Sequence, residues 1–461
     1  MPKAEQVHRQ GFNEGAPEAP GALANAGPLP EHWYVRLLSS LYLATFLIRF
    51  SFGMILLAFP IYTGVKEFGS FGILAAAAPA AELVVVLIAG PLMDRHGRRN
   101  VLLFGLLVAA ASNFLISQTT NYSILLVVNA LHGVSSGTIL VSSLALLADY
   151  VPLEHRGREI GMFDGINLGG WGIGFAAAGF LVGWLGGIGQ LHLLFVLGGV
   201  VALGGFVWAY FNLFEPAADQ ILAREEIEPT RVLRVLTRPS VFVLVVPWVV
   251  IYSFIGLLLA FGPKSATQDF GLPPEQVGLL FAVVTIGFIF FQRGYGSLSD
   301  RWGRTVVMGI GVSGIVLLLL TTAGVYLAAE DPNDASELLG IITKNPAVIG
   351  LFGLGLLMAG GFAPAALAAL ADQAHADERG ITMSLYSVAV SLGQIIGPAG
   401  AGPLIDRFGG IGTLAFLGVG GAVLVSSLAA RRFLQTSDLH AAIGSVKEAA
   451  GRGSIRSDSE E

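Results

Sequence analysis

The sequence has no cysteine among its 461 residues. This absence excludes disulfides, thiol nucleophiles and zinc sites built on thiolates. Charge is also scarce, because Asp, Glu, Lys and Arg together make up 13% of the chain, whereas soluble domains carry roughly 25%. A long chain with so little charge cannot hide its apolar surface in water. We therefore expect its solvent to be a lipid bilayer.

Hydrophobic residues and glycine are abundant instead. Hydrophobic residues make up 54% of the chain and glycine occurs 61 times, as expected where membrane helices pack closely. A spanning helix needs about 20 mainly apolar residues, and the sequence offers twelve such windows. They are 37–61, 70–93, 101–118, 122–148, 159–184, 191–214, 240–263, 276–298, 305–328, 346–370, 381–404 and 411–433.

The distribution of Lys and Arg predicts the topology of these spans. Twelve spans place both termini on one side, and the tails and loops of that side hold 20 of the 26 basic residues. Such an excess is typical of the cytoplasmic side. We therefore expect a multi-pass protein, in the plasma membrane, with both termini cytoplasmic. In this topology the loop at 94–100 is cytoplasmic and the loop at 331–345 is external.

Two pairs of segments reveal an internal repeat. Residues 90–99 read GPLMDRHGRR and residues 296–305 read GSLSDRWGRT, with six of ten positions identical. Residues 179–189 and 402–412 share six of eleven positions. The offsets are 206 and 223, and the long loop between the ninth and tenth spans accounts for the difference. Repeats of this kind occur in transporters that rock two bundles around a midplane site.

The predicted fold is therefore an all-α membrane protein with twelve transmembrane helices in two six-helix bundles related by a parallel repeat. The predicted parts are a disordered cytoplasmic tail (1–35), an N-terminal bundle (36–214), a cytoplasmic linker (215–238), a C-terminal bundle (239–433) and a second cytoplasmic tail (434–461).

The segment GPLMDRHGRR resembles the signature loop of the major facilitator superfamily, between its second and third helices. In that family the acid of this loop faces a helix N-terminus of the other half, and an arginine pairs with a carboxylate at the end of the fourth helix. The resemblance implies a gate that closes the cytoplasmic face. The implied gate residues, including the second copy of the loop, are Asp94, Arg95, Gly97, Arg98, Asp149, Asp300, Arg301, Gly303, Arg304 and Asp372.

A second resemblance lies in the fifth span, GMFDGINLGGWGIGFAAAG. Its glycines match the pattern of superfamily members that export drugs in exchange for protons, although Phe175 replaces the usual proline and Ala178 one of the paired glycines. Close packing through small residues is the alternative explanation of this pattern. These exporters often carry an arginine in the fourth helix, and Asn129 stands at the corresponding place here.

Ionisable groups at membrane depth are costly and usually functional. Arg49 lies near the middle of the first span, Glu82 near the middle of the second, and Asp164 within the fifth. One hypothesis makes Arg49 and Glu82 a permanent ion pair between adjacent helices. The other makes Glu82 a proton carrier that Arg49 controls, with Asp164 as a further candidate for proton coupling, because burial and a neighbouring cation act oppositely on a carboxyl group.

Further polar side chains within the spans are candidates for a substrate cavity. The predicted cavity residues are Asn129, His132, Asn167, Trp171, Tyr252, Tyr386 and Gln394. No nucleotide-binding loop or cysteine cluster is present, so we expect no enzyme activity, no cofactor and no metal site.

The leading functional hypothesis is alternating-access secondary transport, with proton-coupled export of small amphipathic organic molecules. The alternatives are uptake of an organic anion with Arg49 as an anion clamp, and a receptor or lipid scramblase on the same scaffold. The expected partners are a small-molecule substrate, protons and the lipid bilayer, with no nucleic acid, and we expect a monomer.

Overall fold

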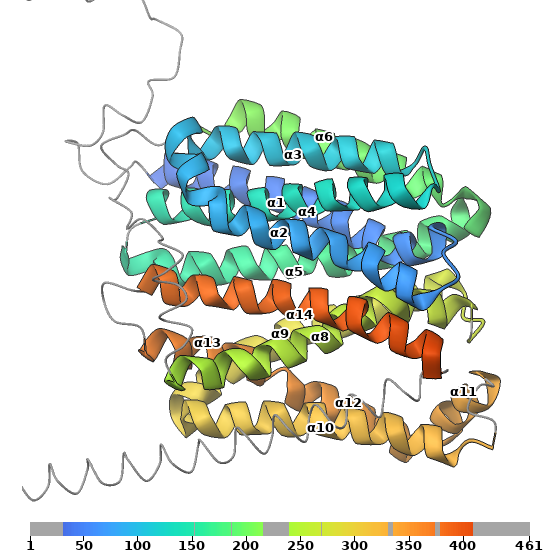
Figure 1. The fold of residues 1–461 in the computed structure, drawn as a ribbon. Coiled ribbons are helices and arrows are strands. Elements are labelled where there is room, and N and C mark those ends of the chain that lie inside the picture. The colour runs from blue at the N-terminus through green and yellow to red at the C-terminus, as the bar shows by residue number, and fades with distance from the viewer. Residues whose placement is uncertain are drawn as a thin grey trace, which may run out of the picture.

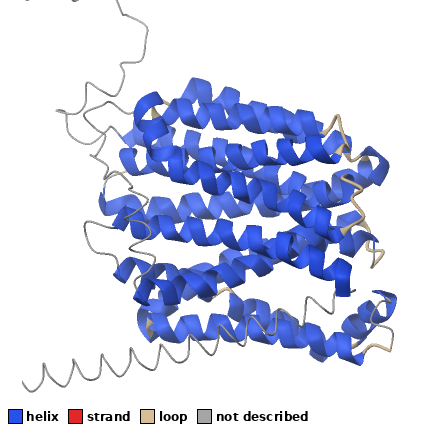
Figure 2. Ribbon diagram, viewed as in Figure 1, coloured by secondary structure: helices blue, strands red, loops and turns tan. Residues whose placement is uncertain are grey.

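The structure is a computed structural model that describes residues 31–408, apart from 152, 186, 215–238, 269, 331–334 and 374–378. The regular elements of these described residues are all helices (Figure 2). The predicted twelfth span, the linker and the C-terminal tail lie outside the described residues. So does most of the predicted N-terminal tail, whose last residues instead belong to the first helix, which begins at Glu31.

The helices form the two groups predicted from the repeat, coloured blue to green and yellow to red in Figure 1. The N-terminal bundle consists of α1 (Glu31–Tyr62), α2 (Phe68–His96), α3 (Arg98–Ile116), α4 (Tyr122–Tyr150), α5 (Leu153–Trp184) and α6 (His192–Asn212). The described part of the C-terminal bundle consists of α8 (Pro239–Gln268), α9 (Pro274–Trp302), α10 (Arg304–Ala328), α11 (Ala335–Lys344), α12 (Pro346–Ala359), α13 (Phe362–Gln373) and α14 (Arg379–Phe408).

Eleven segments of the described residues are long and apolar enough to cross a membrane, which confirms the predicted fold class. The predicted span at 346–370 differs in detail, because a break at Gly360 and Gly361 divides it into α12 and α13. The insertion located from the repeat offsets contains the short helix α11 (Figure 1).

Single glycines connect the helices at the repeated loops. Gly97 separates α2 from α3 with φ 86° and ψ 151°, and Gly303 separates α9 from α10 with φ 92° and ψ 148°. This backbone region is essentially restricted to glycine. The glycine of the signature loop is therefore required by the one-residue reversal of the chain.

The two bundles meet mainly along two helix pairs, α2 with α14 and α5 with α9, and α1 also contacts α8. Close packing between them is seen at the end of the molecule that contains Asp406, which we call the Asp406 end. A Cβ at Gly72 would lie 2.1 Å from the Pro398 carbonyl oxygen, and one at Gly179 would lie 2.7 Å from that of Pro274. Such approaches exclude any side chain at these positions.

The opposite end of the bundles, which contains the signature loop, is here called the Asp94 end. Toward this end a Cβ at Gly161, Gly165 or Gly169 of α5 would meet no described atom within 4 Å, and the Asp164 side chain on the same segment is exposed. The bundles are therefore packed tightly at the Asp406 end and separate toward the Asp94 end.

Candidate functional site

A cavity of about 130 Å³ lies between the two bundles. Residues of α1, α2, α4 and α5 form one wall, and residues of α8 and α14 form the other. Most of the lining is apolar, from Phe52, Ile55 and Phe59 of α1 to Leu259 of α8. A largely apolar cavity with few polar groups is typical of sites for small organic molecules.

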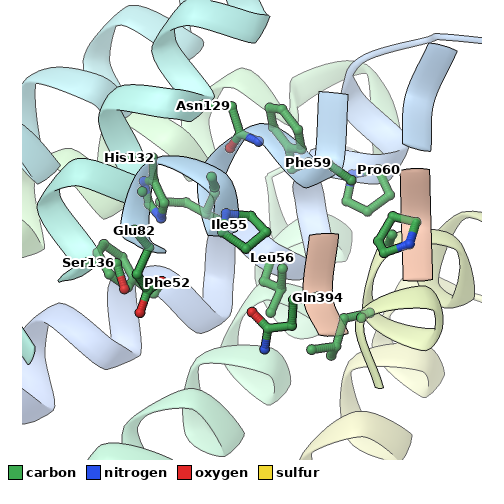
Figure 3. Close-up of a pocket in the computed structure, with 18 of the residues that line it drawn as sticks. Phe52, Ile55, Leu56, Phe59, Pro60, Glu82, Asn129, His132, Ser136 and Gln394 are labelled. Carbon is green, nitrogen blue, oxygen red and sulfur yellow. The ribbon is translucent and has the colours of Figure 1, made fainter. Parts of the chain in front are cut away.

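Glu82 is the carboxyl group that lines this cavity among the described residues. Asn129, His132 and Ser136 of α4 line the cavity beside it (Figure 3). Their spacing places them on one face of α4. A Cβ at Gly133 on this helix would lie 1.9 Å from the Ala78 carbonyl oxygen, so the α4 backbone lies directly against α2. This contact positions the α4 polar side chains next to Glu82.

Arg49 lies behind the cavity wall and is 3% exposed. Its Nη1 donates to the Ser136 hydroxyl at 3.3 Å. Its guanidinium carbon lies 5.5 Å from the centre of the Phe52 ring and 5.9 Å from that of Trp171. Contacts of this kind with aromatic faces favour a cation when water is excluded.

Of the two hypotheses for Arg49 and Glu82, the permanent direct ion pair is not seen in this structure. No ion pair within 4.0 Å joins these two described side chains. The reason is the helix arrangement, because α4 packs against α2 and brings Ser136 to Arg49 of α1. Ser136 and Glu82 both line the cavity. The sequence reasoning did not select this serine, which bonds to Arg49 in the same cavity wall as Glu82.

Several buried polar atoms around Arg49 have no hydrogen-bond partner among the described residues. They are Arg49 Nε, His132 Nδ1, Asn167 Oδ1 and Trp171 Nε1. The His132 ring also packs on Phe52, with centroids 4.2 Å apart. Because buried polar atoms are normally paired, each of these atoms can form a hydrogen bond with a water molecule. Asp164 on α5 interacts electrostatically with Arg49 and reaches the open space toward the Asp94 end.

The predicted cavity residues divide into three groups. Asn129, His132, Trp171 and Gln394 line the cavity, although the Asn129 amide also donates to the Leu74 carbonyl at 2.8 Å. Asn167 and Tyr252 do not line it, and Tyr252 packs instead against Gly393 of α14. The Tyr386 side chain lies outside the described residues.

The signature loop forms a partly buried polar cluster at the Asp94 end. Arg98 Nε lies 2.9 Å from Asp149 Oδ2, and Arg98 Nη2 lies 3.3 Å from Asp94 Oδ1. Arg99, which the gate prediction omitted, donates to the Leu213 and Tyr210 carbonyls at the end of α6, both at 2.6 Å. A cation at a helix C-terminus is favoured by the helix dipole.

The second copy of the loop repeats part of this arrangement. Arg304 pairs with Asp300 and also donates to the Ser299 hydroxyl at 3.0 Å. The Arg95 and Arg301 side chains are both exposed. The Asp372 side chain lies outside the described residues, so the predicted partner of Arg304 on that helix stays a prediction.

A contact at the Asp406 end was also missed by the sequence reasoning. Asp406 Oδ1 accepts from the Phe68 amide at 2.9 Å, and Oδ2 accepts from the Gly69 amide at 2.6 Å. Nearby, the buried Lys264 ammonium of α8 donates to the Val65 carbonyl. The only sequence signal was the position of Asp406 in the second repeated segment, where the first copy has glycine.

Comparison with known proteins identifies the family. The family model described as Major Facilitator Superfamily matches residues 41–264 and 248–457. The quinolone resistance protein NorA of Staphylococcus aureus (strain MRSA252) is 22% identical over 384 residues, covering 79% of this chain and 89% of NorA. Multidrug resistance protein 2 of Bacillus subtilis (strain 168) is 25% identical over 390 residues, covering 81% and 88%.

Solved structures show the same fold. The nucleoside transporter NupG superposes with a TM-score of 0.67 at 15% identity, over 86% of this chain and 99% of NupG. The human organic anion transporter MFSD10 (TETRAN) superposes with a TM-score of 0.61 at 17% identity, over 87% and 100%. The chain therefore belongs to the Major Facilitator Superfamily and is a multi-pass membrane transporter rather than an enzyme.

Proposed function

We propose that this transporter exports small amphipathic organic molecules in exchange for protons by alternating access. The support from comparison is that relatives aligned over most of the chain are named for quinolone and multidrug resistance. The support from the site is a largely apolar cavity between the bundles with a carboxyl group in its wall. An apolar wall suits the organic body of a substrate, while the few polar groups fix its orientation.

The observation that carries the coupling is the placement of Glu82. Glu82 lines the cavity, and Arg49 lies behind the wall, where it donates to Ser136, another residue of the lining. A substrate in the cavity and a proton on Glu82 therefore compete for the same region. In this proposal Arg49 stays within the protein and controls how readily Glu82 ionises. Asp164, near Arg49 but outside the cavity lining, is the proposed second carboxyl group for the proton.

Alternating access follows from the bundle packing. With the Asp406 end closed, the substrate reaches the cavity from the Asp94 end. The topology that we propose from the Lys and Arg distribution makes the Asp94 end cytoplasmic. The tight helix pairs at the Asp406 end must then separate, and the signature loops must close the Asp94 end, for the substrate to leave on the outside. We propose that a monomer in the plasma membrane performs this cycle.

The anion-uptake alternative assigns a different task to Arg49. As an anion clamp, its guanidinium would have to reach the substrate, whereas here it is 3% exposed behind Phe52 and Trp171. This burial supports the use of Arg49 as an internal charge. Uptake of organic anions is an outcome of the experiment below.

The test is transport by purified protein in liposomes with an imposed pH gradient, with a panel of amphipathic cations, neutral compounds and organic anions. We expect substrate movement against its gradient, with protons moving in the opposite direction. The Glu82→Gln variant keeps the side-chain shape and removes the titration. It is expected to exchange substrate without accumulating it, whereas Gln394→Ala, a cavity change without a charge, should alter affinity and keep coupling. Gradient-driven transport by Glu82→Gln with the parent's pH dependence would contradict the assignment of Glu82.

A further inference from the structure

The contact between Asp406 and α2 joins the two bundles. Both carboxylate oxygens of Asp406, near the end of α14, accept hydrogen bonds from the first two amides of α2. The first amides of a helix have no partner within the helix, and the helix dipole favours a negative charge at this end. The contact therefore satisfies two donors of one bundle with an acid of the other.

The backbone around this contact is shaped for close approach. A Cβ at Gly69 would lie 2.9 Å from Asp406 Oδ2, and a Cβ at Gly402 would lie 2.3 Å from the Phe68 carbonyl oxygen. Any side chain at Gly402 would push the helices apart, because the atom that it meets belongs to the backbone. The glycines thus permit the short distances of the Asp406 hydrogen bonds.

A second charge reaches the same segment from α8. Lys264 is 8% exposed, and its ammonium donates to the carbonyl of Val65, in the segment that joins α1 to α2. The same ammonium lies 5.3 Å from the centre of the Phe68 ring and 5.7 Å from that of Phe71. An acid and a base of the C-terminal bundle therefore both bind residues 65–71 of the N-terminal bundle.

Among the described residues, the repeat-related interface between α5 and α9 carries its acid on the other helix of the pair. Under the offset of 223, the place of Asp406 is taken by Gly183. Under the offset of 206, the place of Gly69 is taken by Glu275, an acid in the first turn of α9 itself. The α9 N-terminus thus carries a negative charge from its own helix, whereas α2 receives one from the other bundle.

We propose that Asp406 and Lys264 form a lock that holds the Asp406 end closed while the cavity is reached from the Asp94 end. The lock must break whenever the bundles rock to open the Asp406 end. It complements the signature loop, because α2 and α14 each carry an acid near their last turn, Asp94 and Asp406, at opposite ends of the same helix pair. The proposal rests on alternating access, and is independent of substrate identity and of the coupling ion.

The test measures distances across both ends of the molecule by pulsed electron paramagnetic resonance in lipid nanodiscs. Because the chain has no cysteine, spin labels can be placed at Lys66 and Gln268 for the Asp406 end, and at Asn100 and Trp302 for the Asp94 end. We expect Asp406→Asn to raise the ratio of open to closed molecules at the Asp406 end by about two- to five-fold, the size expected for one charge at a helix N-terminus.

The matched control is Glu67→Gln. Glu67 precedes the same helix N-terminus but belongs to the N-terminal bundle, and its carboxylate accepts from the Ser70 hydroxyl at 2.9 Å. Its loss removes an equal charge without breaking an inter-bundle contact, so the distances should match those of the parent. Lys264→Met, which keeps an apolar side chain, should shift the ratio in the same direction as Asp406→Asn, and it serves as the test if Asp406→Asn fails to fold.

Two results would overturn the lock. The first is that the parent interconverts between open and closed states, and that Asp406→Asn, or Lys264→Met as its substitute, gives the same distances as the parent. This result would show that these charges do not hold the Asp406 end closed. An equal shift in Glu67→Gln would assign the effect to the helix dipole alone. A parent with one fixed distance at each end under every condition would instead contradict alternating access, on which the lock rests. These measurements need neither substrate nor a pH gradient, so failure of the export proposal alone leaves them interpretable.

Discussion

Arg98 Nε lies 2.9 Å from Asp149 Oδ2, and the two side chains are only 2% and 4% exposed. The pair connects the first residue of α3 to the last turn of α4. Asp94 lies 3.3 Å from the same guanidinium but is 55% exposed. One arginine therefore makes a buried contact that holds the N-terminal bundle together and an exposed contact that is free to exchange partners.

Removing the buried partner should be costly. We expect Arg98→Met to lower the free energy of unfolding by about 3–5 kcal/mol, because it removes one partner of a buried ion pair. Arg95→Met in the same loop is the control, since Arg95 is exposed and exposed charges contribute about 1 kcal/mol or less. Thermal unfolding of both variants in detergent, followed by tryptophan fluorescence, would check this. Equal midpoints for the two variants would contradict the structural role of the pair.

Two glycines of α5 should respond differently to the same substitution. A Cβ at Gly174 would lie 2.3 Å from the Phe50 carbonyl oxygen, whereas one at Gly165 would meet no described atom within 4 Å. We expect Gly174→Ala to reduce stability and expression by forcing α1 away from α5. Gly165→Ala should be neutral or stabilising by up to about 1 kcal/mol, because alanine is the better helix former. Thermal midpoints measured side by side would decide, and comparable losses in both would refute the packing argument.

The exposed contact between Asp94 and Arg98 should affect the conformation of the transporter and leave its folding intact. We expect Asp94→Asn to shift molecules toward the state open at the Asp94 end, opposite to the shift expected for Asp406→Asn, because the signature loop would lose the charge that closes this end. Labels at Asn100 and Trp302 would report the change. Normal flux together with an unchanged distance distribution would contradict a role of Asp94 in closing this end.

The fold was predictable because its main signals are periodic or repeated. Apolar windows gave the spans, and the two copies of the signature loop gave the bundle arrangement. The break at Gly360 and Gly361 escaped prediction because it accompanies close packing between helices: a Cβ at Gly311 of α10 would lie 2.4 Å from the Phe362 amide nitrogen at the start of α13. Hydropathy carries no information about such contacts.

The residues of the candidate site were more predictable than their geometry. Arg49, Glu82 and Asp164 stood out because ionisable residues are rare at membrane depth, but their geometry depends on which helices are neighbours. Helices consecutive in sequence were assumed to touch, whereas α4 supplies the side chain that bonds to Arg49 in the same cavity wall as Glu82. The Asp406 contact could not be predicted for a related reason, because Asp406 and Gly69 are 337 residues apart in sequence.

Ser136 gives the sharpest test of how Arg49 and Glu82 are coupled. Its hydroxyl accepts a hydrogen bond from Arg49 Nη1 at 3.3 Å and lines the same cavity as Glu82. We expect Ser136→Ala to fold and to keep the cavity, because the change removes one oxygen atom and adds no bulk. Loss of this hydrogen bond to the Arg49 guanidinium is worth about 1 kcal/mol. If Arg49 controls the ionisation of Glu82, this corresponds to a shift of about half to one pH unit in the midpoint of proton-driven flux.

The control is the neighbouring serine on the same helix. The Ser135 hydroxyl donates to the His132 carbonyl at 2.7 Å, a contact within α4 that touches neither charge. Ser135→Ala should therefore leave the pH midpoint unchanged, while Ser136→Ala moves it and Glu82→Gln abolishes the pH dependence. The measurement is the initial rate of substrate flux into proteoliposomes at a series of external pH values with the gradient held constant. If Ser136→Ala and Ser135→Ala give the same midpoint as the parent, Arg49 does not control Glu82 through this serine. The pH dependence would then have to come from Asp164, which Asp164→Asn would test in the same assay.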